Sequence, residues 1–285
     1  MAERMADLTA QIESVHQLDA VVTAMRGIAA SRAQKGRSLL PGIEAYTDVV
    51  SRAIGHALNL QPVEPIAAPR DGHRRRGIIL FCAEQGFVGA FNERVVGGVA
   101  DELADATVFL LGTRGAAYAR ERGITPAWTA PMATNAEAVP DLANRLAEAV
   151  YGRIAGDGLA RVDIVHSRLG EEGQIGVDRH SLLPIDFGRF RRPSEGRVPL
   201  TNLPPPILLE RLAAEYIYAQ LCQAAMHAFE AENQARMIAM AAARTNIEEK
   251  LGDLTQRERR LRQESITAEI VELATGTEAM ATRKN

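Results

Sequence analysis

Apolar residues recur every three or four positions along the first forty residues of the chain. This spacing places them on one stripe of a helix, and no proline interrupts residues 2–40. The stripe consists of Leu8, Ile12, Val15, Leu18, Val22, Met25 and Ala29. Pro41 and Gly42 can bend the helix, and the apolar pattern resumes as far as Leu58. We therefore expect a helical first segment over residues 1–60.

A second helical pattern occupies the end of the chain, over residues 205–285. No proline follows Pro206, and Gly252 is the only glycine between Ile207 and Thr275. A continuous helix of roughly 69 residues would be on the order of 100 Å long. Its apolar stripe consists of Met237, Met240, Ile247, Leu251, Leu254 and Leu261, and then of Ile266, Ile270 and Leu273 in a shifted register. A register shift near Arg262 predicts that the helix changes its neighbour there.

Neither terminal helix is stable alone. Burying seven apolar side chains gives roughly 10–20 kcal/mol, whereas ordering about forty residues costs about 1–2 kcal/mol each. A partner is therefore needed, and an exposed stripe would favour aggregation. Each terminus can supply the partner of the other, so we predict a long antiparallel coiled coil of the N- and C-terminal helices.

The middle of the chain, residues 72–195, has a different pattern. Short apolar runs rich in β-formers alternate with helical stretches, which predicts an α/β domain with a mostly parallel sheet. The expected strands are Gly77–Cys82, Val108–Gly112, Val162–His166 and Gln174–Val177, and the expected helices are Asn92–Leu103, Arg114–Arg122 and Asn135–Ile154. The stretch Gln61–Arg70, with three prolines, is expected to be a linker.

Composition narrows the class of protein. The formal net charge of −3 creates no global basic field that would attract nucleic acid. No run of about 18 apolar residues is present, so we expect no membrane span, and the N-terminus has no signal-peptide pattern. Cys82 and Cys222 lie in apolar surroundings and are expected to be buried free thiols. We expect a soluble protein that faces the cytoplasm, which is compatible with peripheral attachment to a membrane complex.

Catalytic chemistry finds no support in the sequence. The histidines show no metal-ligand spacing, and neither cysteine belongs to a CxxC pair. The histidines are His16, His56, His73, His166, His180 and His227. We expect no catalytic residues, no cofactor and no metal site.

Two other functions remain as alternatives. The strand Ile78–Phe81, the turn Gly86–Gly89 and the helix after it could bind a phosphate group of a nucleotide. However, neither G-x-G-x-x-G nor G-x-x-x-x-G-K-[ST] occurs there. The clusters Arg74–Arg76 and Arg189–Arg192 could serve a coiled-coil nucleic-acid-binding protein, although the acidic net balance favours a solvated or subunit-facing surface.

Motifs at both ends resemble a known family. The first helix carries AMRGIAASR at Ala24–Arg32, and the last helix carries ENQARMIAM at Glu232–Met240 and RQESITAEIVE at Arg262–Glu272. The middle carries QGFVGAFN at Gln85–Asn92 and GTRG at Gly112–Gly115. Taken in their order along the chain, these motifs resemble those of the gamma subunit of rotary F-type ATP synthases, and the resemblance covers nearly the whole chain.

The resemblance implies a mechanical role. The gamma subunit is a central shaft whose paired termini turn inside a ring of alpha and beta subunits, while its globular part contacts the epsilon subunit and the membrane c-ring. It performs no bond chemistry itself, and it is peripheral on the cytoplasmic face of the bacterial cell membrane. The choice between protons and sodium lies in the c-ring, outside this chain.

The resemblance also suggests rotor–stator contact residues. Arg236, Arg262, Gln263 and Thr267 match family positions that engage loops of the beta subunits. Met25 and Arg26 match positions near the lever region of beta. An arginine can transfer hydrogen bonds between carboxylates through its planar fork. The alternative interpretation is a solvated helix face for the arginines and core packing for Met25.

Several positions depart from the family pattern. Val88 and Ala90 replace the cysteine and glycine of the family's GLCGG turn, and Arg26-Gly27 replaces a lysine and methionine. Arg244 occupies a position that usually holds threonine, and Pro199–Pro204 replaces an acidic aromatic segment. The c-ring contacts can therefore differ, which points to a divergent branch, such as one encoded beside a second, ion-specific synthase.

Overall fold

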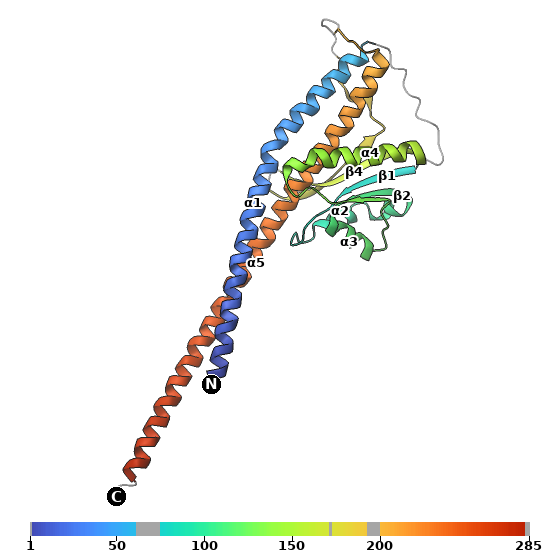
Figure 1. Cartoon of the computed structure of the whole chain (residues 1–285). Coiled ribbons are helices and arrows are strands. Elements are labelled where there is room, and N and C mark those ends of the chain that lie inside the picture. The colour runs from blue at the N-terminus through green and yellow to red at the C-terminus, as the bar shows by residue number, and fades with distance from the viewer. Residues whose placement is uncertain (1, 61–74, 171–172, 193–199, 283–285) are drawn as a thin grey trace. The chain divides into compact units, whose positions relative to one another are not determined.

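Two long helices form the ends of the chain in the computed structural model, which describes residues 2–60, 75–170, 173–192 and 200–282. Helix α1 spans Ala2–Leu58 and helix α5 spans Pro205–Thr282 (Figure 1). Helix α1 continues through Pro41, which is exposed. Helix α5 begins with two prolines, at positions where a helix needs no donor N–H. Both predicted terminal helices are confirmed.

The chain divides into two compact units. One contains residues 1–28 and 237–285, and the other contains residues 29–236. We call them the tip unit and the body unit and describe each by itself. Among the described residues, none of the helices combines the length and the apolar character that crossing a bilayer requires.

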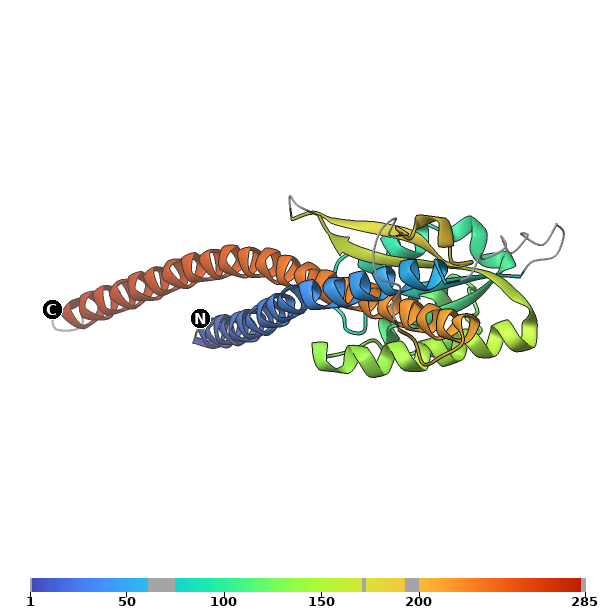
Figure 2. The ribbon, with the colours of Figure 1, turned by 90° about the horizontal axis from the view of Figure 1, so that it is seen from above.

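The two helices run antiparallel in both units. In the body unit, Arg37 pairs with Glu230 at 2.8 Å, and Tyr46 donates a 2.5 Å hydrogen bond to Glu215, so moving forward along α1 means moving back along α5 (Figure 2). In the tip unit, Asp19 lies 3.7 Å from Arg244. The predicted antiparallel pairing is confirmed.

The apolar stripe of α1 in the tip unit differs from the prediction at one position. Leu18 is 55% exposed, and Asp19 takes its place in the helix contact. Contact positions on a helix alternate between steps of three and four residues. A step of four residues from Val15 leads to residue 19, and not to Leu18. By contrast, Leu8 and Leu254 are buried as expected.

The body unit contains a five-stranded sheet in the order β3-β2-β1-β4-β5. Only β5 runs antiparallel to its neighbour among the described strands, so the mostly parallel sheet is confirmed. The strands are β1 (Arg75–Phe81), β2 (Ala106–Leu111), β3 (Trp128–Ala130), β4 (Leu159–Leu169) and β5 (Ile175–Leu183). Strand β3 was not predicted, because three residues are too few to show a period.

The connecting helices are partly as predicted. They are α2 (Phe91–Gly97), η1 (Ala100–Asp105), α3 (Thr113–Glu121), η2 (Ala136–Ala138), α4 (Val139–Asp157) and η3 (Phe187–Arg189). A single helix over Asn92–Leu103 is wrong, because α2 ends at the Gly97-Gly98 pair and a separate 3₁₀ helix follows. Helix α4 ends at Gly158, whose left-handed backbone (φ 67°) closes it.

Alternate residues of the central strands face opposite sides of the sheet. Ile79, Phe81 and Ile164 pack against α4 and the body segment of α5. Ile78 and Leu80 pack on the other side, in a cluster with residues of α2 and α3. Figure 1 shows α4 on one side of the strands and α2 and α3 on the other. The body segment of α5 is therefore part of the core of the α/β domain.

Candidate functional site

The six predicted contact residues fall in different environments. Gln263 and Thr267 are exposed in the tip unit and lie on one face of α5, four residues apart. Arg262 is also exposed and pairs with Glu258 on the same helix at 3.1 Å. On α1, Arg26 is exposed and Met25 is half-buried. The structure therefore presents three polar side chains together on the surface of α5.

An exposed apolar face follows these residues along α5. Ile266 is 51% exposed, Ile270 60% and Leu273 71%, and the spacing places them on one face. Asp19 lies opposite Arg244, and the two helices are antiparallel. Ala2, at the start of α1, therefore lies opposite Leu261, which is the same number of residues away from Arg244. Helix α1 therefore ends its pairing where the predicted register shift begins, and Ile266 and Ile270 have no helix of this chain opposite them among the described residues.

Arg236 lies in a different environment, because it is buried in the body unit with 4% exposure. Its guanidinium donates to the Glu232 carboxylate at 2.6 Å and to the Asn233 side chain at 3.2 Å. It also donates to the backbone carbonyls of Gln85 and Gly86 at 3.3 and 3.2 Å. Arg236 thus joins α5 to the loop that follows β1.

The Glu232 carboxylate completes this junction. It accepts hydrogen bonds from the backbone N–H groups of Glu84 and Gln85, both at 3.1 Å. Glu84 in turn accepts from Thr113 and from the N–H of Met132. We call Glu232, Arg236 and the loop residues 84–86 the loop anchor. The sequence analysis missed the loop anchor, although a Glu and an Arg four residues apart are a visible signal.

The loop anchor bears on the nucleotide-binding alternative. The amides of Glu84 and Gln85 already bind a carboxylate of this chain. Helix α2, after the turn, has only seven residues and no side-chain cap. In that turn Phe87 (φ 60°) and Gly89 (φ 57°) have left-handed backbones. A carboxylate of this chain therefore occupies the amides of Glu84 and Gln85, and the turn after them is a tight connection.

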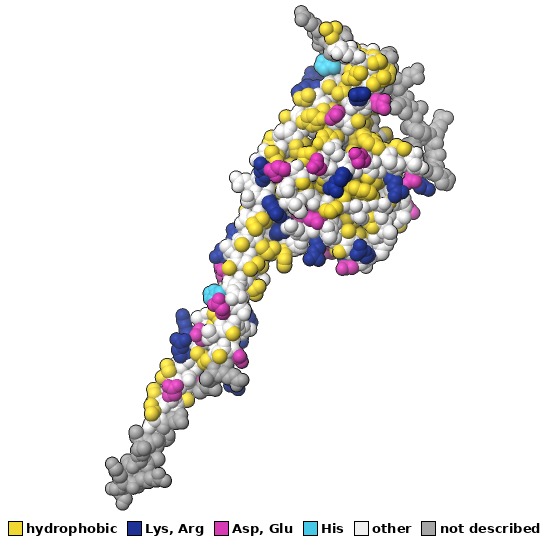
Figure 3. Space-filling model, viewed as in Figure 1, with side chains coloured by type: hydrophobic (Ala, Val, Ile, Leu, Met, Phe, Trp, Pro, Cys, Tyr) yellow, Lys and Arg dark blue, Asp and Glu magenta, His cyan; other side chains and the backbone are white. Residues whose placement is uncertain are grey.

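The first of the two basic clusters considered for nucleic acid is also used within the chain. Arg76 pairs with Glu102 and with buried Asp163, and Arg75 lies 3.8 Å from Asp157, while Arg74 lies outside the described residues. Arg179 pairs with the same two acids as Arg76. Figure 3 shows basic and acidic side chains interspersed on the face it presents. The described arginines of strand β1 neutralise neighbouring acids instead of forming a basic patch.

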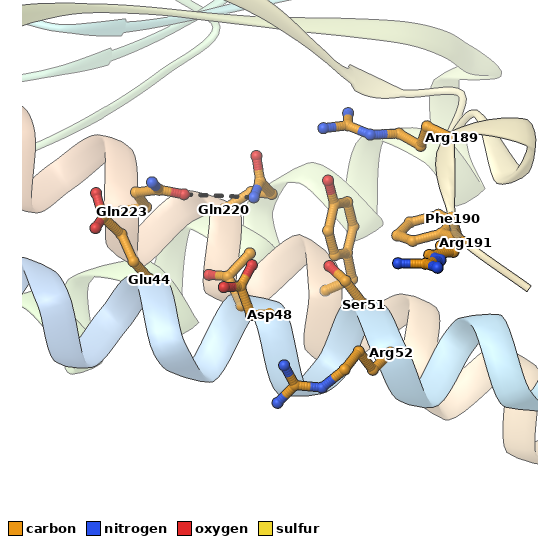
Figure 4. A pocket seen from close by; sticks show the side chains of 11 residues that line it. Glu44, Asp48, Ser51, Arg52, Arg189, Phe190, Arg191, Gln220 and Gln223 are labelled. Atoms are coloured by element: carbon orange, nitrogen blue, oxygen red, sulfur yellow. Dashed lines mark hydrogen bonds between the residues drawn. The ribbon is translucent and has the colours of Figure 1, made fainter. Parts of the chain in front are cut away.

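A polar cavity of about 610 Å³ lies in the body unit between α1, α5 and the segment around η3. Figure 4 shows Glu44 and Asp48 on α1, Arg189 and Arg191 on the segment around η3, and Gln220 donating to Gln223 on α5. Helix α1 contributes the acidic groups and also Arg52, whereas the segment around η3 contributes the guanidiniums of Arg189 and Arg191. This cavity offers charges of both signs and is suited to polar contact with a partner.

Burial shifts the pKa of several groups in the body unit. It lowers the pKa of His166 and of His227 to about 4, and it lowers the pKa of His180. Burial also raises the pKa of the Cys82 thiol to about 12 and that of Cys222 above its usual value. Both cysteines are free and buried, as predicted. These three histidines are neutral and the two thiols are protonated at neutral pH.

Two terminal helices paired antiparallel around an α/β insertion define a shaft-type subunit. The family model described as ATP synthase matches residues 4–280, and the chain belongs to that family. Among curated proteins, the ATP synthase gamma chain of Beutenbergia cavernae is 28% identical, covering 95% of this chain and 96% of the relative. The gamma chain of Bdellovibrio bacteriovorus is 25% identical over 97% of this chain and 98% of its own. The resemblance stated from the sequence is confirmed.

Solved structures share the fold. A chain of the Euglena gracilis mitochondrial ATP synthase (OSCP/F1/c-ring) gives a TM-score of 0.67 at 14% identity, covering all of this chain and 97% of that one. A chain of the central stalk/c-ring structure from Tetrahymena thermophila gives 0.55 at 14% identity, covering 78% and 99%. At such low identity the likeness concerns the fold.

Proposed function

We propose that this chain is the central rotor shaft, the gamma subunit, of an F-type ATP synthase. It couples ion-driven rotation of a c-ring to conformational cycling of the catalytic alpha and beta subunits. The observation that carries the proposal is the antiparallel pairing of the two chain ends in a chain of this family. Rotation requires a stiff rod and no bond chemistry, so the chain's own residues act by contact alone.

The exposed polar side chains of the tip unit suit transient contact. The Arg262–Glu258 pair lies on the surface, with side chains 66% and 24% exposed. Such pairs contribute about 0–1 kcal/mol, so the guanidinium can exchange Glu258 for a carboxylate of a beta subunit at little cost. Gln263 and Thr267 are proposed to bind the same loops, and Met25 and Arg26 to lie near the beta lever region.

The exposed side chains of Ile266 and Ile270 are proposed to turn against the inner wall of the alpha–beta ring. Burying one such side chain fully is favourable by about 1.5–3 kcal/mol. A row of them left in water would favour aggregation. Contact without directional hydrogen bonds allows the helix to rotate with little hindrance.

Arg236 is proposed to act as a positioning residue instead of a direct contact. Its side chain is buried, and its donors bind the loop of residues 84–86 and Glu232. In this role it holds the α/β domain onto α5, so that torque on one part reaches the other. In this proposal, Arg236 is part of the family motif because it forms this junction within the chain.

We assign residues 1–60 and 205–285 to the shaft helices and residues 72–195 to the globular domain. The globular domain is proposed to contact the epsilon subunit and the c-ring. The complex then places the chain peripherally, on the cytoplasmic face of the bacterial cell membrane. Nucleic acid and a bound nucleotide have no role in this proposal.

The test uses the double variant Gln263→Ala with Thr267→Ala in the reassembled complex in vesicles. The control is Thr245→Ala with Gln256→Ala, which removes the same side-chain types from other exposed positions of α5. We expect ATP hydrolysis to continue while ions pumped per ATP fall several-fold, and the control to pump normally. The helical circular dichroism of the isolated chain should stay unchanged in both.

Unchanged ATP-driven pumping in the test variant would contradict the assigned contacts. Failure of the wild-type chain to assemble with alpha and beta subunits would contradict the rotor function itself.

A further inference from the structure

Three histidines and one aspartate from three elements of the body unit lie together. His166 is on β4, Asp178 and His180 are on β5, and His227 is on α5. His166 and Asp178 are direct partners in the antiparallel pair, and His180 is two residues further on. All three strand residues therefore share one face of the sheet. We call these four residues the histidine cluster.

Three ring nitrogens of the histidine cluster lack hydrogen-bond partners. Nε2 of His180 and both ring nitrogens of His227 are buried without a hydrogen-bond partner. Leaving a buried polar atom unpaired costs roughly 1–3 kcal/mol, and stable cores rarely retain several such atoms close together. The arrangement is therefore expensive as a purely structural core and calls for a ligand.

The tautomer of His166 is set by its surroundings. Nδ1 lies 3.1 Å from the backbone carbonyl of Ser167, which can only accept, so Nδ1 carries the proton. Nε2 therefore has a free lone pair, and it lies 4.0 Å from the Asp178 carboxylate. A histidine that donates one N–H to a carbonyl and presents the other nitrogen is the usual arrangement at metal sites.

We propose that His166, Asp178 and His180 bind a zinc ion. One nitrogen or oxygen of each lies within 4.8 Å of the others. Tetrahedral zinc holds ligands at about 2.0–2.1 Å, and hence roughly 3.3 Å apart, so small side-chain rotations bring these atoms into position. Two neutral imidazoles and one carboxylate match the ligand preference of zinc, and the carboxylate offsets part of its charge.

His227 lies against this site from α5. Its ring stacks on His166, with centroids 5.6 Å apart and planes 7° from parallel. A water in the fourth position of the zinc would give His227 a hydrogen-bond donor. Zinc would thus tie the β4–β5 pair to the body segment of α5. The inference is separate from the rotor function, because it concerns a ligand of the isolated chain.

The experiment uses the untagged full chain, freed of metal with a chelator and titrated with Zn²⁺ or with Co²⁺ as an optical probe. We expect one equivalent of Co²⁺ to give the absorption bands of a four-coordinate site, Zn²⁺ to displace it, and Zn²⁺ to raise the melting temperature. Asp178→Asn and His180→Gln should each weaken binding at least tenfold. His16→Gln, which removes an exposed histidine of the tip unit, should leave binding unchanged.

Two results would overturn the proposal. One is the absence of stoichiometric Zn²⁺ binding by the wild-type chain at micromolar concentration. The other is equal affinity in the wild type and in Asp178→Asn, whose half-exposed side chain can be replaced without disturbing the core. Metal-free circular dichroism of each variant separates a lost ligand from a lost fold.

Discussion

Arg236 provides the sharpest test of how the body unit is held together. The substitution Arg236→Met keeps the aliphatic length of the side chain and removes its charge and donors. The Glu232 carboxylate would then stay buried without its 2.6 Å partner, and the carbonyls of Gln85 and Gly86 would lose a donor. Because both side chains of the pair are 5% exposed, water cannot easily replace the guanidinium.

The expected loss of stability follows from that burial. Removing one partner of a buried ion pair costs about 3–5 kcal/mol, because the other charge remains uncompensated. The control Arg262→Met breaks an ion pair of the same i,i+4 type, with Glu258, on the helix surface, where such pairs contribute about 0–1 kcal/mol. The double variant with Glu232→Gln should recover part of the loss, since the unpaired charge is then gone.

Unfolding in urea, followed by the fluorescence of Trp128, measures this loss. Trp128 is the only tryptophan of the chain, and it lies on β3 with its ring 6.3 Å from that of Phe109. Its signal therefore reports on the α/β domain, and the helical circular dichroism of the same samples reports on the long helices, one of which carries Arg262. A loss below about 1 kcal/mol in Arg236→Met would refute the reasoning, and so would an equal loss in the control.

Three further predictions probe packing. Gly115→Ala should destabilise the domain by about 1–3 kcal/mol, because the new methyl group would overlap Cys82, whereas Gly152→Ala, in open space on α4, should stabilise it by about 0.5–1 kcal/mol. Unfolding in urea measures both changes, and a change in stability of the same sign in both variants would contradict the packing. Leu254→Ala should lower the free energy of unfolding by about 2–5 kcal/mol, and Leu18→Ala by less than about 0.5 kcal/mol. Thermal loss of helical circular dichroism measures both effects. A larger effect at Leu18 than at Leu254 would contradict the register of the two helices. Burial raises the pKa of Cys82 from 9.0 to about 12, so the thiol's contribution to stability is complete below pH 9 and falls as pH rises towards 12; its alkylation at pH 8 should be slow until urea unfolds the chain, and a fast native rate would contradict the burial.

Much of the fold could be predicted because its signals are local. The terminal helices follow from the 3–4 spacing and the absence of proline, and strands β1, β2 and β4 follow from runs of β-formers. The errors occurred where the local signal is weak or shared. Leu18 and Asp19 both fit a helical stripe roughly, and only the partner helix decides which of them faces it. Strand β3 has three residues, and its hydrogen bonds to β2 define it.

The candidate sites divide in the same way. Gln263 and Thr267 are exposed on the segment of α5 after Leu261, where the sequence already predicts that the helix changes its neighbour. The burial of Arg236 depends on the loop after β1, about 150 residues earlier in the chain. The histidine cluster shows no spacing in the sequence, because its members meet only through the register of β4 with β5 and the passage of α5.

By itself, the sequence determined the long helices, the inserted α/β domain and the family, because periodicity and motifs are properties of neighbouring residues. Only the tertiary structure decided which arginine is buried in the loop anchor and which lies on the surface, and which histidines lie together. Burial and pairing across distant segments depend on how those segments pack, and such distances in space leave no mark in the order of residues.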